Sequence, residues 1–203
     1  HFGQATAYVG DMLNSDLVDN ISGRVAGIDR PADNAFYRTD DRKAPHNAYT
    51  SAECIQDGID YLGYNTAYPE GYDGHYTFAQ GNEVVTLDAG EDAKKVVVGY
   101  PNNKPWFEYN EEDGLYYRYQ YGDKHIDELT GEQLAYSNVI FQYCHGEVRD
   151  KEDYLAFGCH GDEDRMIRVF SRGKMIPGTW HRESDDVPAT YLDYYGEPIV
   201  LSP

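Results

Sequence analysis

Residues 106–121 read WFEYNEEDGLYYRYQY, and this stretch decides the fold class. Two aromatic-rich runs, Trp106–Tyr109 and Leu115–Tyr121, flank a polar segment that ends in Gly114. Aromatic and β-branched residues favour strands, and a short polar loop with a final glycine is typical of a hairpin connection. In the second run, alternate residues fall on opposite faces of an extended chain. The stretch therefore predicts an antiparallel β-hairpin.

Similar short runs recur through the second half of the chain. They predict strands at 83–87, 95–100, 139–144, 155–158, 166–170, 175–180, 190–192 and 199–201, with tight turns at 171–174 and 194–197. Because these strands follow predicted helices along the chain, they indicate an α+β fold with a mostly antiparallel β-sheet or sandwich.

Two or three short helices are predicted. Apolar residues at helical spacing favour a helix over 5–13, and Thr50 with Glu53 forms a T-x-x-E capping box for a second helix that ends at Gly63. Thr130 and Gln133 form a similar box for one helical turn that ends near Tyr136. Residues 19–42 and 64–82 read as loops, with a short strand at 24–28.

The organisation follows from this pattern. We expect a single-domain fragment with a helical and loop-rich part at 1–63 and a β-rich part at 83–203. The chain opens directly in a helical pattern at His1 and stops just after the predicted strand at 199–201. These ends indicate a piece of a longer protein.

Composition and charge exclude some partners. The 203 residues include 20 tyrosines and have a formal net charge of −19. Nucleic acid is not expected as a partner, because its binders need clustered Lys and Arg to replace counterions on the phosphates. An anionic membrane surface would also repel the chain, and most of the acidic residues are expected to be solvated. No run of about 18 apolar residues occurs, so no transmembrane helix is predicted.

The three cysteines leave several alternatives open. Cys144 and Cys159 each precede His-Gly and flank a polar segment, so a disulfide could join them if the flanking strands pair, and two separate thiols are the alternative. The two Cys-His pairs could instead supply four zinc ligands, but they lack the short C-x-x-C spacing, so no metal site is predicted. Cys54 lies on the apolar side of the second predicted helix and is expected to be a buried thiol.

Several segments resemble a known family. The stretch Ala44–Ser51 reads APHNAYTS and resembles the A-P-H-N-x-Y-T-S signature of the YerB-like lipoproteins, a bacterial family of unknown function. Further matching segments follow in the family's order and extend over nearly the whole chain. They are Tyr117-Arg118 with Gly122, His125, Asp127 and Thr130; Asn138-Val139-Ile140; Gly173-Lys174; Gly178-Thr179-Trp180 with Arg182; and Asp193, Gly196 and Ile199–Leu201.

The resemblance implies an exported protein, anchored by a lipid outside this fragment, at the surface of a Gram-positive cell. It also implies a further N-terminal part and a continuation beyond Pro203. It implies no enzyme activity and supplies no catalytic residues. The two Cys-His-Gly units depart from the family pattern.

The polar residues of these segments are the candidate site. His46, His125 and Asp127 are the candidate catalytic residues, because a histidine beside a carboxylate can act as a general acid or base. The alternative is that His125 and Asp127 only fix a loop. The candidate ligand-binding residues are Asn47, Tyr49, Ser51, Arg118, Asn138 and Arg182. Residues 46–51 would form one wall of a pocket, and Arg118, His125 and Asp127 would form the other.

Two functions remain open from the sequence. No nucleophile elbow, phosphate loop, dinucleotide fingerprint or complete EF-hand is present, so no cofactor is predicted. The favoured hypothesis is a non-catalytic cell-envelope domain that binds a wall glycan, a peptide or a partner protein. The alternative is an enzyme acting on a cell-wall polymer, with the His/Asp/Arg pocket as its active site.

Overall fold

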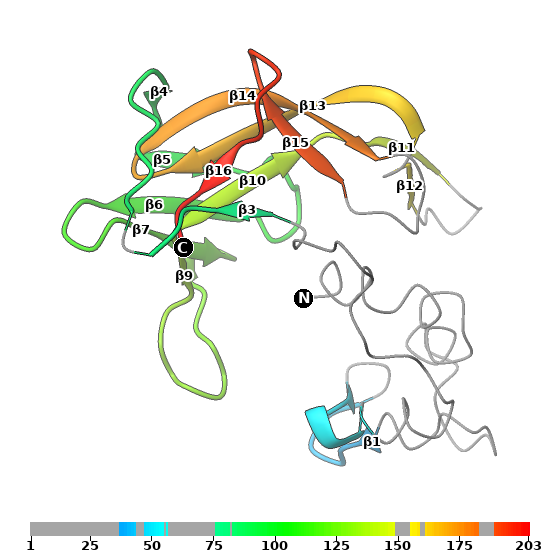
Figure 1. The fold of residues 1–203 in the computed structure, drawn as a ribbon. Helices are drawn as coiled ribbons and strands as arrows, with labels where there is room; N and C mark the ends of the chain where they lie inside the picture. Colours follow the sequence, from blue (N-terminus) through cyan, green and yellow to red (C-terminus); the bar gives the residue numbers. More distant parts are fainter. Residues whose placement is uncertain are drawn as a thin grey trace. The chain divides into compact units, whose positions relative to one another are not determined.

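The computed structural model describes residues 37–43, 47–54, 56, 76–81, 83–148, 155–158, 161–182 and 189–203. The chain forms two compact units, residues 1–75 and Tyr76–Pro203. Figure 1 shows the strands of both, and each unit is described by itself. The described residues are mostly strand, so the predicted antiparallel β architecture is confirmed, whereas helix is confined among them to 52–54 and 56.

The first unit contains one short antiparallel pair. Strand β1 (Tyr37–Arg38) pairs with β2 (Ala48–Tyr49), and the rings of Tyr37 and Tyr49 stack across the pair with centroids 6.2 Å apart. The helical turn that follows is capped by Ser51, whose Oγ accepts a hydrogen bond from the backbone N–H of Cys54 at 3.1 Å. The predicted cap was Thr50, so the helix begins one residue later than expected.

The second unit contains two five-stranded sheets. The first has the order β5-β6-β7-β8, with β9 also paired to β7, and consists of β5 (Lys95–Val97), β6 (Trp106–Asn110), β7 (Leu115–Gln120), β8 (Asp123–Lys124) and β9 (Ala135–Tyr136). The second has the order β10-β13-β14-β15, with β4 also paired to β14, and consists of β4 (Glu91–Asp92), β10 (Asn138–Gln142), β13 (Gly161–Ser171), β14 (Lys174–Arg182) and β15 (Thr190–Asp193). All these pairings are antiparallel.

Two smaller pairs complete the unit. Strand β11 (His145–Val148) pairs antiparallel with β12 (Leu155–Gly158), and β16 (Val200–Leu201) pairs in parallel with β3 (Thr77–Phe78). The β3–β16 pair joins the start of the unit to its end, as Figure 1 shows.

One core lies between the two sheets. Alternation along each strand sends every second side chain inward, so Tyr116 of β7 meets Val139 of β10 and Phe170 of β13. Tyr116 has no exposed surface, and its hydroxyl donates to the carbonyl of Ala93 at 3.0 Å. The two sheets therefore pack as a sandwich, which is one of the two predicted architectures.

A second core covers the opposite face of the second sheet. Ile167 and Val169 of β13 and Trp180 of β14 pack there against Ile199 and Leu201. The indole N–H of Trp180 donates to the carbonyl of Tyr143 at 3.0 Å. The second sheet therefore buries side chains on both faces near the end of β13, with Val169 in one core and Phe170 in the other, whereas Met166 and Arg168 are exposed.

The predicted turns at 110–114, 171–174 and 194–197 are confirmed. In the β13–β14 hairpin only Arg172 and Gly173 lie between paired strand ends, with φ of 47° and 76°. This is the backbone of a type I′ turn, whose twist matches that of its flanking strands.

Three predicted elements are wrong. Residues 130–136 form a turn and the short strand β9 instead of a helical turn, because the carboxylate of Asp127 binds the backbone N–H groups of Leu129 and Thr130. Residues 83–87 carry β-branched side chains but pair with no strand among the described residues. Within the predicted 64–82 loop, residues 77–78 form β3, because the final strand of the chain binds them.

Several predictions fall outside the described residues: the helix over 5–13, the strand at 24–28 and most of the helix that ends at Gly63. The strands that flank Cys144 and Cys159 do pair, with His145 opposite Gly158. Cys144 is present as a half-buried thiol and Cys159 is not described, so the disulfide stays a prediction.

Candidate functional site

The structure brings together three of the predicted site residues. Arg118 lies on β7, while His125 and Asp127 lie between β8 and β9, in the connection that folds back along β7. The backbone N–H of His125 donates to the carbonyl of Arg118 at 3.0 Å, and the amide of Gln133 donates to the same carbonyl at 2.9 Å. These bonds hold the connection against β7.

The side chains of Arg118 and His125 are in direct contact. Arg118 Nη1 lies against Nδ1 of the imidazole. A guanidinium can only donate, so Nδ1 must accept with its lone pair and the ring proton belongs on Nε2. Burial and the neighbouring positive charge of Arg118 lower the pKa of His125 from its ordinary value of 6.5, although Asp127 acts in the opposite direction. The geometry therefore favours a neutral imidazole.

Asp127 is occupied by its own loop. Its Oδ1 accepts hydrogen bonds from the backbone N–H groups of Leu129 at 3.0 Å and Thr130 at 2.8 Å. These bonds lower its pKa, the Thr130 bonds most strongly. No hydrogen bond joins Asp127 to His125 in the described part of the chain. Asp127 therefore fixes the conformation of its loop, as the alternative interpretation predicted, and does not orient the imidazole.

This arrangement can bind more readily than it can transfer protons. The Nδ1 lone pair of His125 is engaged by Arg118, and its proton lies on Nε2. Because the pKa of the imidazole is lowered, adding a second proton to the ring is unfavourable. A general base needs a free lone pair within reach of its substrate. Arg118 and His125 can instead offer N–H donors to an acceptor.

The other wall of the predicted pocket lies in the first unit. Asn47 accepts a bond from Arg38 Nη1 at 2.6 Å and donates to the carbonyl of Thr39 at 2.8 Å, so its amide fixes the β1–β2 connection. Tyr49 stacks on Tyr37, and Ser51 caps the helical turn. His46 lies outside the described residues. Because the two units are described separately, a pocket shared by residues 46–51 and His125 stays a prediction.

Asn138 and Arg182 lie elsewhere in the second unit. Asn138 clamps the last segment, because its amide donates to the carbonyl of Ser202 at 2.7 Å and accepts from the N–H of Ser202 at 3.2 Å. Arg182 ends β14, opposite Gly161. Burial raises the pKa of Tyr191, and the positive charge of Arg182 nearby acts in the opposite direction.

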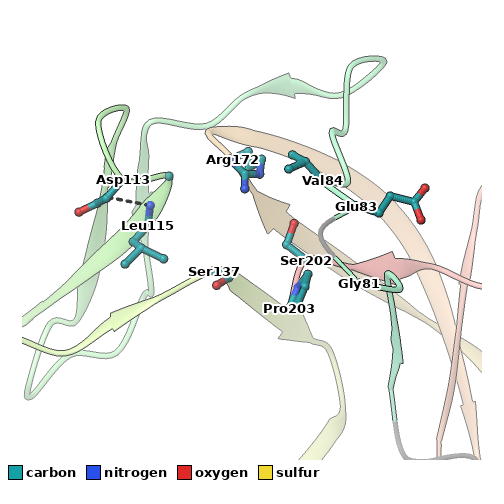
Figure 2. A pocket seen from close by; sticks show the side chains of 10 residues that line it. Gly81, Glu83, Val84, Asp113, Leu115, Ser137, Arg172, Ser202 and Pro203 are labelled. Atoms are coloured by element: carbon teal, nitrogen blue, oxygen red, sulfur yellow. Dashed lines mark hydrogen bonds between the residues drawn. The ribbon is translucent and has the colours of Figure 1, made fainter.

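A cavity of about 340 Å³ lies where the turns of the two sheets meet, and none of the residues that line it is among the predicted site residues. Figure 2 shows Arg172, from the β13–β14 turn, standing between Leu115 on one side and Val84 and Ser202 on the other. The lining residues come from five separate segments: Gly81, Glu83 and Val84; Asp113, Gly114 and Leu115; Ser137; Arg172; and Ser202 and Pro203.

Arg172 is the only basic residue of this lining. Its Nε is buried and has no hydrogen-bond partner, and its guanidinium forms no ion pair among the described residues. Gly114 lies directly beside it, since a Cβ at that position would come within 3.0 Å of Nη1. The cavity therefore contains a partly buried positive charge without a counter-ion among the residues that the structure describes.

The two carboxylates of the lining do not neutralise Arg172. Asp113 accepts hydrogen bonds from the Tyr117 hydroxyl at 2.6 Å, the Asn110 amide at 3.1 Å and the Leu115 N–H at 3.0 Å. The Tyr117 bond is the main cause of its lowered pKa. Figure 2 shows the carboxylate of Glu83 pointing away from Arg172.

One signal in the sequence could have indicated Arg172. Type I′ turns require positive φ at both central residues and prefer Asn, Asp or Gly at the first. Residues 171–174 read SRGK, so an arginine occupies the position where asparagine is favoured. A residue that opposes the local backbone preference often has a functional reason to be there.

Comparisons with known proteins agree with the fold. Residues 96–203 match the C-terminal domain of DUF3048, described as a protein of unknown function. The crystal structure of the YerB protein from Bacillus subtilis is similar at 20% sequence identity, with a TM-score of 0.62 over 83% of this chain and 53% of that one. The chain thus spans about half the length of that relative. No curated protein matches the sequence.

The described residues contain no group of three or more His, Cys, Asp or Glu side chains placed to hold a metal ion. No described helix is long and apolar enough to cross a membrane.

Proposed function

Because the chain belongs to the YerB-like DUF3048 family of unknown function, we propose that it is a non-catalytic binding domain of an exported, lipid-anchored cell-envelope protein. Its ligand is a wall glycan, a peptide or a partner protein. The anchor lies outside residues 1–203, as expected from the family resemblance, and the partners do not include nucleic acid.

The cavity around Arg172 carries this proposal. Its volume of about 340 Å³ lies within the usual range for small-ligand pockets, roughly 300–1,000 Å³. Arg172 lines the cavity with a half-buried guanidinium that forms no ion pair among the described residues, and an anionic group of a ligand would complement this charge. Two hairpin turns and the Ser202 segment, which Asn138 clamps, form the frame around it.

The enzyme alternative receives less support. His125, one of its two acid–base candidates, is engaged by Arg118, and Asp127, the carboxylate expected to orient it, is engaged by the loop backbone. His46, its second histidine, lies outside the described residues. An acid–base mechanism at this place would need both side chains to leave their observed partners.

A pull-down tests the binding function. The 203-residue chain is immobilised and incubated separately with purified cell wall, with soluble wall fragments and with a detergent extract of membranes. We expect a glycan, a peptide or a protein to be retained by the wild-type chain and lost after heat unfolding. Retention of nothing from any of the three preparations would contradict the proposal.

Cell fractionation tests the location. We expect the native full-length protein to sediment with membranes, to be released by detergent, and to be cleaved by protease added to cells stripped of their wall. A full-length protein found in the cytosol would contradict the envelope assignment.

A further inference from the structure

We propose that the Arg172 cavity binds the carboxylate of its ligand, supplied by the carboxyl terminus of a peptide or by an acidic sugar. This inference rests on the proposed binding function and specifies the chemistry of the cavity. Its starting point is the guanidinium of Arg172, whose donors have no acceptor in the described residues and whose Nε is buried.

The chemistry of the lining selects an oxyanion. A guanidinium presents its N–H groups as a planar fork that matches a carboxylate or phosphate with two parallel hydrogen bonds. Ser137, also in the lining, has a side-chain hydroxyl that makes no hydrogen bond among the described residues and can donate a third. Leu115 and Val84 supply apolar walls beside these donors.

The charge balance favours a carboxylate over a phosphate. The lining holds one positive group, Arg172, and two negative ones, Glu83 and Asp113. A monoanion satisfies the single guanidinium, whereas a dianion would place a second negative charge near Asp113 without a cation to match it. The net charge of −19 also opposes polyanionic ligands.

The backbone supports the same assignment. Arg172 has a φ of 47°, which is unfavourable for a residue with a Cβ, and asparagine would suit the turn better. Replacing Arg172 by asparagine should therefore remove the charge without weakening the hairpin. This separates a binding role from a folding role at one position.

The test is an NMR titration of the 15N-labelled chain with matched pairs of small probes. N-acetylglycine is compared with N-acetylglycinamide, glucuronate with glucose, and inorganic phosphate is tested alone. Because small fragments bind weakly, each titration extends to tens of millimolar. We expect saturable shifts at Gly114, Ser137 and Gly173 with at least one carboxylate, and none with its neutral counterpart. The tighter carboxylate identifies the peptide or the sugar as the source.

Two variants complete the test. Arg172→Asn is expected to weaken carboxylate binding at least tenfold while its unfolding midpoint stays equal or rises. Arg168→Gln removes the same charge from an exposed position of β13 and should bind like the wild type. The proposal is overturned if neither carboxylate binds, if the neutral probes bind equally, if phosphate binds more tightly, or if the Arg172→Asn variant binds normally. If the pull-down still succeeds in any of those cases, the binding function stands and only the carboxylate assignment fails.

Discussion

At the residue scale, Arg118 and His125 show how a fixed charge sets the state of a titratable neighbour. The guanidinium stays protonated at all relevant pH values, so contact with it disfavours a second positive charge on the imidazole. Asp127 lies near enough to act in the opposite direction, but its Oδ1 accepts hydrogen bonds from the loop backbone. A histidine two residues from an aspartate in sequence therefore need not form an acid–base pair.

Substitutions of the two charged neighbours of His125 should shift its pKa in opposite directions. In the wild type, NMR titration of the imidazole should give a pKa below 6.5. Arg118→Gln removes the neighbouring positive charge and should raise that pKa, whereas Asp127→Asn removes a negative charge and should lower it. An unchanged pKa in Arg118→Gln would show that burial alone causes the shift.

The same shift has a consequence for stability. The folded state binds the His125 proton less tightly than the unfolded state, so the unfolded state carries more protons as the pH falls. The contribution of His125 to the free energy of unfolding is fully present above about pH 6.5. It is lost as the pH falls through the lower pKa of the folded state. The unfolding midpoint of His125→Gln should therefore depend less steeply on pH between 8 and 5.5. His145→Gln, which removes an exposed histidine of β11, is the control.

At the element scale, the β13–β14 hairpin joins the two sheets through its turn. Gly173 lies against the ring of Tyr109, so that a Cβ at this position would come within 2.8 Å of two ring carbons. It also needs a φ of 76°. Glycine meets both requirements, and the adjacent Arg172 is thereby held over the cavity.

Two glycine substitutions separate these requirements. Gly173→Ala combines an unfavourable φ, about 1–2 kcal/mol, with an overlap that adds roughly 1–3 kcal/mol. Gly196→Ala has the same backbone problem at a φ of 84°, but its Cβ would meet nothing within 4 Å, so it should lose only about 1–2 kcal/mol. Urea denaturation measures both. Equal losses would show that the Tyr109 ring moves aside.

Local pattern predicted most strands of this molecule and failed at particular places. The hairpin at 106–121 was found because alternation, aromatic content and a terminal glycine agree there. The segment 83–87 has the composition of a strand but finds no partner in the part of the chain that the structure describes. By contrast, β3 has little strand signal but pairs with β16. Pairing depends on what lies opposite, which the local sequence does not contain.

At the scale of the whole molecule, the second unit contains both described cores. One lies between its two sheets, and the other is closed by Ile199 and Leu201 against β13 and β14. The first and last strands of the unit, β3 and β16, bind each other. A unit whose ends are paired and whose cores are internal has what independent folding requires.

We therefore expect residues 76–203 to fold without the first unit. The isolated fragment should show dispersed amide resonances and a single cooperative unfolding transition. A matched fragment of residues 83–203 lacks β3 and should be less stable, because it exposes the edge of β16 and one side of the second core. A non-cooperative 76–203 fragment would contradict this prediction.

The sequence by itself determined the β architecture, the family and the turns, because each depends on residues that are neighbours along the chain. It also predicted that Arg118, His125 and Asp127 lie near one another, and β7 with the connection between β8 and β9 brings them together, whereas their role as a site stays a prediction. Only the tertiary structure decided that Asp127 binds its loop, that Asn138 clamps Ser202, and that a cavity forms around Arg172. These outcomes depend on contacts between distant segments, such as Asn138 with Ser202 and Gly114 with Arg172, whose geometry is fixed by the packing of the two sheets.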